Sequence, residues 1–455
     1  MIKHALLFAA LITAPLAAQG HPAEQVSAER LRSDVAKLVS FGTRHTLSTQ
    51  SDPKRGIGAA VDWGLAEFKR MGVKCGGCLE VLPVAETVTG PRVPTPTLVR
   101  NAVAIQRGTE RPNEVVIVQG HIDSRVSDVM DATSDAPGAN DDGSGTALVL
   151  EAARVLSGTK YPTTIIYALL SGEEQGLHGG QILAKWAEAQ GFTVKAVLNN
   201  DIVGNSCGSD GYCEPRHVRV FSEGPRADLT DRLRAAATRF GGENDTPSRN
   251  LSRWVAGLAA KNTDGLQVRQ IWRTDRMGRG GDQVPFLQKG YPAIRFSVGV
   301  EDYDHQHQDL RTSNGVFYGD TIEEMDFTYL AGVTRLNVRA LDALARAPMP
   351  PKVTVDAAVR TDTELKWKTV LGAQSYSVAT RATDASEWGK DMSLVYIDGP
   401  QASSDAAAAE GREFSHVKKL RGDDWMFGVA ACAGEYCSPV SSAVPGGAFA
   451  PVGKE

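Results

Sequence analysis

The sequence predicts an α/β fold in which helices cover both faces of a mostly parallel mixed sheet, followed by a small C-terminal β-sandwich. Short apolar runs alternate with amphipathic segments between residues 114 and 344, which is the rhythm of strand–helix–strand units. Histidine and acidic residues follow several of these runs, where the carboxyl ends of parallel strands form a ligand crevice. Beyond residue 351 the helical spacing disappears and short alternating runs predict the sandwich.

The elements of the first part follow from the spacing of apolar residues. Apolar side chains recur at helical spacing in residues 28–39 and 59–71, which predicts two helices ahead of the sheet. Short apolar runs then predict buried strands, and longer amphipathic segments predict helices. The strands are expected at residues 114–118, 163–170, 194–198 and 293–298, and the helices at residues 145–156, 177–189, 227–240 and 327–344.

The N-terminus has the pattern of a secretory signal peptide. A basic start precedes an apolar stretch over residues 5–18, which ends in small side chains around residues 17–20. The stretch is too short to span a bilayer comfortably, and we expect no membrane span elsewhere. Residues 1–20 are therefore expected to be a signal peptide and the mature chain to be secreted or periplasmic. The alternative is a buried N-terminal helix.

A proline-rich segment at residues 347–351 predicts a linker between two domains. We place the first domain at residues 21–347 and the β-sandwich at residues 348–455. A Trp-bearing run followed by a Tyr-x-Val run resembles a fibronectin type III module. Such a module could contact the cell envelope, a polymer or a partner, or it could shield the first domain. The alternating runs are residues 364–367, 375–378 and 427–430.

Net charge and cysteine spacing set further limits. The formal net charge of the 455 residues is -5, so nothing favours nucleic-acid binding. Six cysteines fall into local pairs, which predicts disulfides in an exported chain. A zinc or redox role for the Cys-x-x-Cys pair is the alternative, but no second thiol pair lies nearby in sequence. The pairs are Cys75 with Cys78, Cys207 with Cys213, and Cys432 with Cys437.

Three acidic turns follow one another along the first domain. They are His121-Ile122-Asp123, the segment 140–145 with Asp141-Asp142, and the segment 171–174 with Glu173-Glu174. Like charges packed closely repel unless something positive holds them. A pair of divalent metal ions is the simplest candidate, because carboxylate and imidazole groups suit zinc.

Side chains that could bind two metal ions occur one after another along the chain. Glu173 is left beside a ligand, as a general base requires. Asp123 is expected to accept the second ring N–H of His121 and fix its tautomer. Ser144 could cap the helix that follows the second turn. The expected ligands are His121, Asp141, Glu174, Asp201 and one histidine of the cluster at residues 303–309.

This ordered set resembles the di-zinc exopeptidase family that includes bacterial leucyl aminopeptidase and the glutamate carboxypeptidases. The resemblance covers about residues 115–309, and the order and spacing of short motifs carry it. It implies the zinc-exopeptidase type of sheet and two zinc ions per chain. It also implies Asp141 as the bridging ligand, a cis peptide between Asp141 and Asp142, Glu173 as the base and Glu174 as a ligand.

Two positions depart from that family. The last ligand usually stands in a His-Thr/Ser-x-x-Asp stretch; His305 has this spacing before Asp309, but Gln306 replaces the Thr or Ser. We expect His305 as the ligand, with His307 as the alternate, since in an extended segment both would face the same side. A family Ser-Asp-His is here Gly281-Asp282-Gln283, a region expected to line the substrate side.

The function expected from these residues and this resemblance is that of an exported zinc-dependent aminopeptidase acting on peptides or small proteins. A metal-bridged water would attack the first peptide carbonyl, with Glu173 as general base. One alternative is a carboxypeptidase or dipeptidase on the same scaffold, which would need a cation for the substrate carboxylate. Others are a single-zinc acyltransferase such as glutaminyl cyclase, and an inactive binding relative. The candidate cations are Arg125, Arg276, Arg279 and Arg295.

Overall fold

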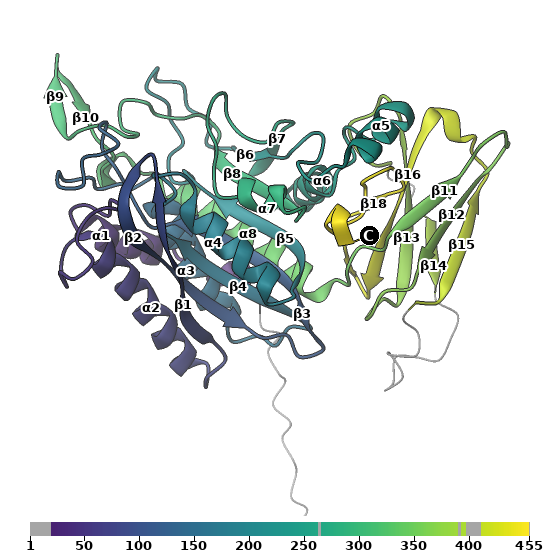
Figure 1. Cartoon of the computed structure of the whole chain (residues 1–455), viewed down its shortest axis with the longest axis horizontal. Helices are drawn as coiled ribbons and strands as arrows, with labels where there is room; N and C mark the ends of the chain where they lie inside the picture. The colour runs from purple at the N-terminus through teal and green to yellow at the C-terminus, as the bar shows by residue number, and fades with distance from the viewer. Residues whose placement is uncertain (1–19, 263–264, 390–392, 397–410, 455) are drawn as a thin grey trace, which may run out of the picture.

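The computed structural model describes residues 20–262, 265–389, 393–396 and 411–454 (Figure 1). The expected signal peptide lies outside the described residues except for residue 20. None of the described helices combines the length and the apolar character that a membrane span requires.

The main sheet is mixed and mostly parallel, which confirms the predicted fold class. Its order is β1-β2-β4-β3-β5-β8-β6-β7. The central strands β4, β3, β5 and β8 pair in parallel, the β1–β2 hairpin adds an antiparallel edge, and β6 runs antiparallel to β8. The bounds are β1 Glu80–Gly90, β2 Val93–Gln106, β3 Arg111–His121, β4 Thr163–Leu170, β5 Thr193–Asn200, β6 His217–Phe221, β7 Gln267–Ile271 and β8 Ala293–Val298.

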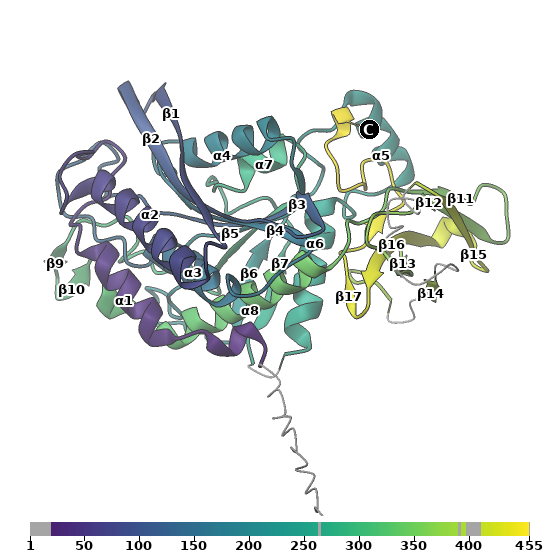
Figure 2. The same cartoon turned by 90° about the horizontal axis from the view of Figure 1, so that it is seen from below.

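Helices cover both faces of this sheet (Figure 2). On β3, Val116 and Val118 pack with α1, α2, α3 and α8, whereas Val115 and Ile117 pack with α4 and α7. This alternation with a period of two explains why the central strands read as continuous apolar runs. The bounds are α1 Ala28–Val39, α2 Gly56–Lys74, α3 Gly143–Leu156, α4 His178–Ala189, α5 Asp231–Phe240, α6 Pro247–Ala260, α7 Val284–Gln288 and α8 Phe327–Arg346.

Elements at the rim of the sheet differ most from the sequence expectation. The hairpin β1–β2 was not predicted, because its exposed outer half carries polar residues and the prolines Pro94 and Pro96. The edge strands β6 and β7 and the helices α6 and α7 were also not predicted. Helix α5 begins at Asp231 rather than at residue 227, with Thr230 as its N-cap.

The C-terminal part consists of antiparallel sheets. One has the order β11-β12-β15, and the other β14-β13-β16-β17 with β18 against β16. Between them Trp367, Tyr376 and Phe414 form a cluster of rings with centroids 5.3–6.2 Å apart. The likeness to a fibronectin type III module stays a prediction. The bounds are β11 Val353–Asp356, β12 Thr363–Lys368, β13 Ser375–Ala382, β14 Ser393–Tyr396, β15 Glu413–Lys418, β16 Trp425–Ala433, β17 Tyr436–Cys437 and β18 Ser441–Ser442.

The C-terminal sheets pack against the α5–α6 side of the first part (Figure 1). Arg381 of β13 donates to Asp245 at 2.7 Å, and both side chains are at most 2% exposed. Arg226 donates to the backbone carbonyls of Gly446, Ala448 and Ala450, near the C-terminus. The sandwich is therefore held to the first part by buried polar contacts.

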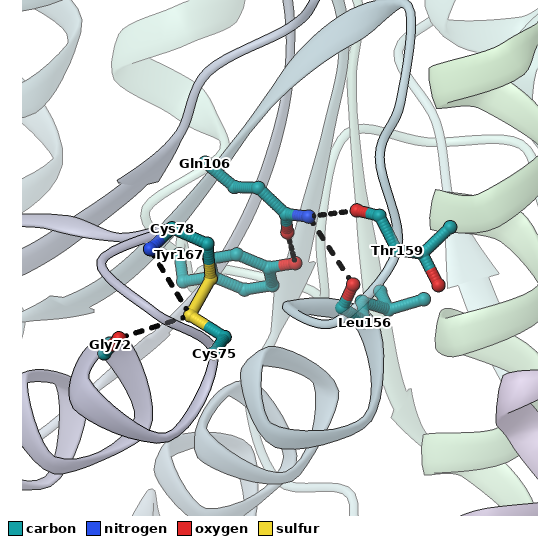
Figure 3. Close-up of a disulfide and its surroundings, with 7 residues drawn as sticks. All are labelled: Gly72, Cys75, Cys78, Gln106, Leu156, Thr159 and Tyr167. Carbon is teal, nitrogen blue, oxygen red and sulfur yellow. Dashed lines mark hydrogen bonds between the residues drawn. A yellow bond between two sulfur atoms is a disulfide. The ribbon is translucent and has the colours of Figure 1, made fainter.

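The three predicted disulfides are confirmed. Cys75–Cys78 closes the turn after α2, and Sγ of Cys75 lies 3.2 Å from the carbonyl oxygen of Gly72 (Figure 3). Beside it, the Tyr167 hydroxyl donates to the Gln106 side chain, which ties β4 to β2. The second bond closes the loop after β5, and the third joins β16 to β17.

Candidate metal centre

His121 is the last residue of β3 and directs its ring toward two carboxylates. Its Nε2 lies 3.1 Å from Oδ1 of Asp141 and 3.9 Å from Oδ1 of Asp201. Its Nδ1 lies 3.1 Å from the backbone oxygen of Asp123 and 3.5 Å from the carboxylate of that residue. The backbone oxygen of Asp123, and not the carboxylate that was expected to accept the ring N–H, is therefore the nearer partner of Nδ1.

The Asp123 side chain has a further function that the sequence did not indicate. Its two carboxylate oxygens accept the backbone N–H groups of Glu173 and Glu174, each at 3.2 Å. The hydroxyl of Thr46 also donates to it at 3.0 Å. Asp123 is fully buried. It therefore ties the end of β3 to the Glu-Glu turn after β4.

In the second acidic turn, the Asp141 side chain faces His121 and His307, and Asp142 is fully buried. The peptide bond between them is cis, as the family resemblance implied. Asp142, not Ser144, caps α3, because its side chain accepts the N–H of Gly145 at 2.9 Å. The Ser144 hydroxyl instead donates to the carbonyl oxygen of Asn140 at 2.7 Å. Asp142 also accepts the N–H of His121, so the cap couples the turn to β3.

Asp320 supports the same turn from a distant segment. Its two oxygens accept the backbone N–H groups of Asn140 and Asp141 at 2.8 and 2.7 Å. The residue follows β10 (Val316–Tyr318), far from the motifs in sequence. No local pattern marks it, so sequence reasoning missed it.

The structure brings His307, and not His305, to the acidic turns. Nε2 of His307 lies 2.8 Å from Oδ2 of Asp141 and 3.0 Å from Oε1 of Glu174. Nδ1 of His305 instead lies 2.7 Å from Asp302. His307 has a φ of 55°, so the segment turns and is not extended. The expectation that both rings face one side therefore does not apply, and the geometry favours the alternate ligand.

Two groups of donors share Asp141. In each group one atom from every member lies within 4.8 Å of the others. Glu173 stands next to both, since it forms a further group with His121 and Glu174. Two imidazoles and three carboxylates are a donor set that suits two zinc ions. The two groups are His121, Asp141 and Asp201, and Asp141, Glu174 and His307.

The charges in the centre favour the ionised form of two proposed ligands, Asp141 and Glu174, whereas burial raises the pKa of Asp201. Burial favours the neutral acid, but His307 and His121 hold the pKa of Asp141 well below its ordinary range. Burial also favours the neutral form of Glu174, but His307 lowers the pKa of this carboxyl to about 2. Glu173 differs, because loss of hydration raises the pKa of its carboxyl well above the ordinary value. The pKa values of the neighbouring carboxyls of Glu173 and Glu174 are therefore shifted in opposite directions. Such a difference is typical of sites that carry out acid–base catalysis.

Arginines pair with Glu174 and Asp201, the two carboxylates that belong to only one of the two donor groups. Nε of Arg125 donates to Glu174 at 2.8 Å. Nη2 of Arg295 lies 2.7 Å from Oδ1 of Asp201, and the side chain of Arg295 is fully buried. Both arginines were expected only as possible partners of a substrate carboxylate. In the structure their charges are directed at the protein's own acids.

The region expected to line the substrate side lies deeper than predicted. Asp282 is 1% exposed, and its Oδ1 accepts the N–H of Gly180 at the start of α4. Gln283 is fully buried and donates to Asp275. A small cleft opens instead beside Asp141, with Ile202 and His305 among its lining residues.

Comparison with known proteins places the chain in a family. Residues 101–314, which include every candidate ligand, match peptidase family M28. A probable zinc metalloprotease of Leptosphaeria maculans is 47% identical over 378 residues, which cover 82% of this chain and 87% of the relative. This chain belongs to peptidase family M28.

Further matches extend the assignment of this M28 peptidase. A probable zinc metalloprotease of Pyricularia oryzae is 40% identical over 435 residues, which cover 93% of this chain and 83% of the relative. The crystal structure of the LapA aminopeptidase of Legionella pneumophila is 18% identical, with a TM-score of 0.50 over 71% of each chain. The latter shows the fold alone. The expected zinc-exopeptidase type of sheet is thereby confirmed.

Proposed function

We propose that this M28 peptidase is a zinc-dependent aminopeptidase that removes N-terminal residues from peptides and binds two zinc ions. The observation that carries the proposal is the pair of donor groups that share Asp141, with Glu173 beside them. The fungal relatives, named probable zinc metalloproteases, support the choice of metal.

The two donor groups support a separate position for each proposed ion. His121 and Asp201 would hold one zinc, Glu174 and His307 the other, and Asp141 both. Bound zinc would supply a Lewis acid for the scissile carbonyl and lower the pKa of the attacking water. The arginines behind Asp201 and Glu174 hold these carboxylates in place.

Glu173 is the group proposed to move the proton. It takes a proton from the attacking water and delivers it to the leaving amine. Its raised pKa suits a carboxyl that must hold the proton between these two steps. Asp123 fixes its backbone through the N–H of Glu173, so the base is held relative to His121.

The arginine contacts support an aminopeptidase over a carboxypeptidase. A C-terminal substrate carboxylate needs a cation that is not already neutralised. Arg125 is paired with Glu174, and Arg295 with Asp201. Arg276 and Arg279 are both paired with Glu301. Arg125, Arg276 and Arg295 therefore already have acidic partners, and Arg279 is the least neutralised of the four, because it shares Glu301 with Arg219 and Arg276. The acidic centre, in contrast, suits a substrate amine.

Substrate comparison tests this proposal. The purified chain should hydrolyse aminoacyl anilides with a free amine, lose this activity on chelation and regain it with zinc. It should leave N-blocked dipeptides intact. Preferential cleavage of N-blocked dipeptides would instead establish a carboxypeptidase or dipeptidase. Cyclisation of N-terminal glutamine, with one zinc per chain, would establish an acyltransferase.

We also propose that the enzyme is exported and that its C-terminal part attaches it to cell-envelope material. Three disulfides support an oxidising compartment. Fractionation of the producing cells, followed by N-terminal sequencing of the mature protein, tests export. Attachment predicts that the intact chain binds cell-envelope material under conditions where peptide turnover is unchanged. Absence of binding would contradict the attachment role.

A further inference from the structure

A chain of ion pairs starts at one proposed zinc ligand. Nη2 of Arg295 lies 2.7 Å from Asp201, and its Nη1 donates to both oxygens of Asp275 at 3.0 Å. Arg276 continues the chain, since its Nε donates to Asp275 and its Nη1 to Glu301, each at 3.1 Å. The charges alternate in sign from Asp201 to Glu301.

Gln306 connects the other end of this chain to Asp141. Nη1 of Arg279 donates to Glu301 at 2.7 Å and to Oε1 of Gln306 at 3.2 Å. Nε2 of Gln306 then donates to Oδ2 of Asp141 at 2.9 Å. A side-chain amide has both an acceptor and donors, so one residue can make the two contacts. The network therefore begins at one ligand and ends at the ligand that both donor groups share.

Burial makes most of this network rigid. The side chains of Arg295, Asp275 and Glu301 are at most 3% exposed. Removing one partner of a buried ion pair leaves an uncompensated charge, so such pairs resist rearrangement. Arg279 is 30% exposed and Gln306 is neutral. The link from Arg279 to Gln306 is therefore the weakest, and it is the one a substitution can open with the least damage to the fold.

We propose that Gln306 is a positioning residue that holds the Asp141 carboxylate so that its two oxygens serve different zinc ions, and that Arg279 anchors it. Oδ1 of Asp141 faces His121 at 3.1 Å, and Oδ2 faces His307 at 2.8 Å. Rotation of the carboxylate would withdraw Oδ2 from the His307 side. The hydrogen bond from Gln306 opposes that rotation, because it is made to Oδ2.

The inference rests on the proposed function, since it requires two ions at Asp141. Loss of Gln306 should affect mainly the ion on the His307 side. Hydrogen-bond partners of metal ligands typically change metal affinity by about 10- to 100-fold when they are removed. The affinity of the ion on the His121 side should change by much less, because Asp201 and its arginine are untouched.

Zinc binding to the full-length Gln306→Leu variant tests the proposal. Dissociation constants are measured by competition with a chelator of known affinity, and stoichiometry by native mass spectrometry. We expect one zinc of wild-type affinity and a second that is about 10- to 100-fold weaker. The melting temperature of the metal-free protein should match the wild type. Gln308→Leu is the control, since Gln308 lies in the same loop but donates to the carbonyl of Tyr303.

Arg279→Met separates the two parts of the proposal. It leaves Gln306 in place but removes its anchor, so the second zinc should again bind more weakly. Combined with Gln306→Leu it should add little. Wild-type affinity for both ions in Gln306→Leu, an equal loss of both, or the same loss in Gln308→Leu would overturn the role of Gln306. Unchanged binding in Arg279→Met would overturn the role of the anchor.

The same measurements distinguish this inference from the proposed function. A wild-type protein that binds fewer than two zinc ions contradicts the proposed di-zinc centre, and with it the role of Gln306. Two wild-type ions together with an unchanged Gln306→Leu variant contradict only the inference.

Discussion

Nε2 of His307 lies 2.8 Å from Oδ2 of Asp141, on the carboxylate oxygen opposite to the one that His121 faces. The two histidines therefore face different oxygens of the Asp141 carboxylate. A bridging ligand between two metal ions needs this arrangement. His305, only two residues from His307, is directed at Asp302 instead.

Substitution of the two histidines should give opposite results. His307→Ala should lose one bound zinc and reduce kcat/KM by more than the roughly 10- to 100-fold typical of an outer-shell partner. His305→Ala should keep both ions. Metal analysis alongside kinetics on an aminoacyl anilide checks this. Loss of zinc in His305→Ala, with full retention in His307→Ala, would reverse the assignment.

Glu173→Gln should separate metal binding from proton transfer. The amide keeps the size of the side chain but cannot accept the proton, so kcat should fall by roughly 10²- to 10⁴-fold. Zinc content should stay at the wild-type value. Glu80→Gln is the control, because Glu80 lies on β1, is 53% exposed and pairs with Arg107. Near wild-type turnover in Glu173→Gln would show that another group is the base.

Removal of zinc should lower stability as well as activity. Ions that bind only the folded state stabilise it by about 4 kcal/mol at a concentration 1,000 times the dissociation constant. The melting temperature should therefore fall on chelation and rise again as zinc is added. Magnesium at the same concentration is the control, since it is a poor match for imidazole ligands. A melting temperature independent of zinc would contradict a zinc site in the folded protein.

The buried ion pair between the two parts of the chain should contribute strongly to stability. Arg381→Met leaves Asp245 buried without its partner, at a cost of about 3–5 kcal/mol. Arg360→Met is the matched control, because its partner Asp362 is 38% exposed, and such pairs contribute about 0–1 kcal/mol. Denaturant unfolding measures both. Equal effects would show that the contact between Arg381 and Asp245 does not hold the sandwich in place.

Glu223 should make stability depend on pH. Burial raises the pKa of its carboxyl to about 8 in the folded protein, whereas an unfolded glutamate has a pKa of about 4.3. The folded state therefore binds the proton more tightly, and stability decreases as pH rises through this window. Glu223→Gln should flatten the decrease and raise stability at pH 8. Unfolding at several pH values checks this, with the exposed Glu243→Gln as control; an unchanged slope in Glu223→Gln would contradict it.

The sequence predicted the strands that are buried on both faces of the sheet. It did not predict the elements at the edges of the sheet. Strands such as β4 are buried on both faces, so the whole element is one apolar run. The β1–β2 hairpin is buried on one side only and carries prolines at its exposed end, so neither pattern stands out. Helix α7 has five residues, which is too short for a helical period to show.

The sequence by itself determined the sheet with its helices, the disulfides and the acidic turns that follow the strands. These features depend on local spacing, and parallel strands bring their carboxyl ends together wherever they form. Only the tertiary structure showed which of His305 and His307 lies beside Asp141 and Glu174, because a positive φ at His307 turns the segment. It alone also placed Asp320 and Gln306 on the Asp141 turn, since contacts across 165 residues or more leave no local pattern.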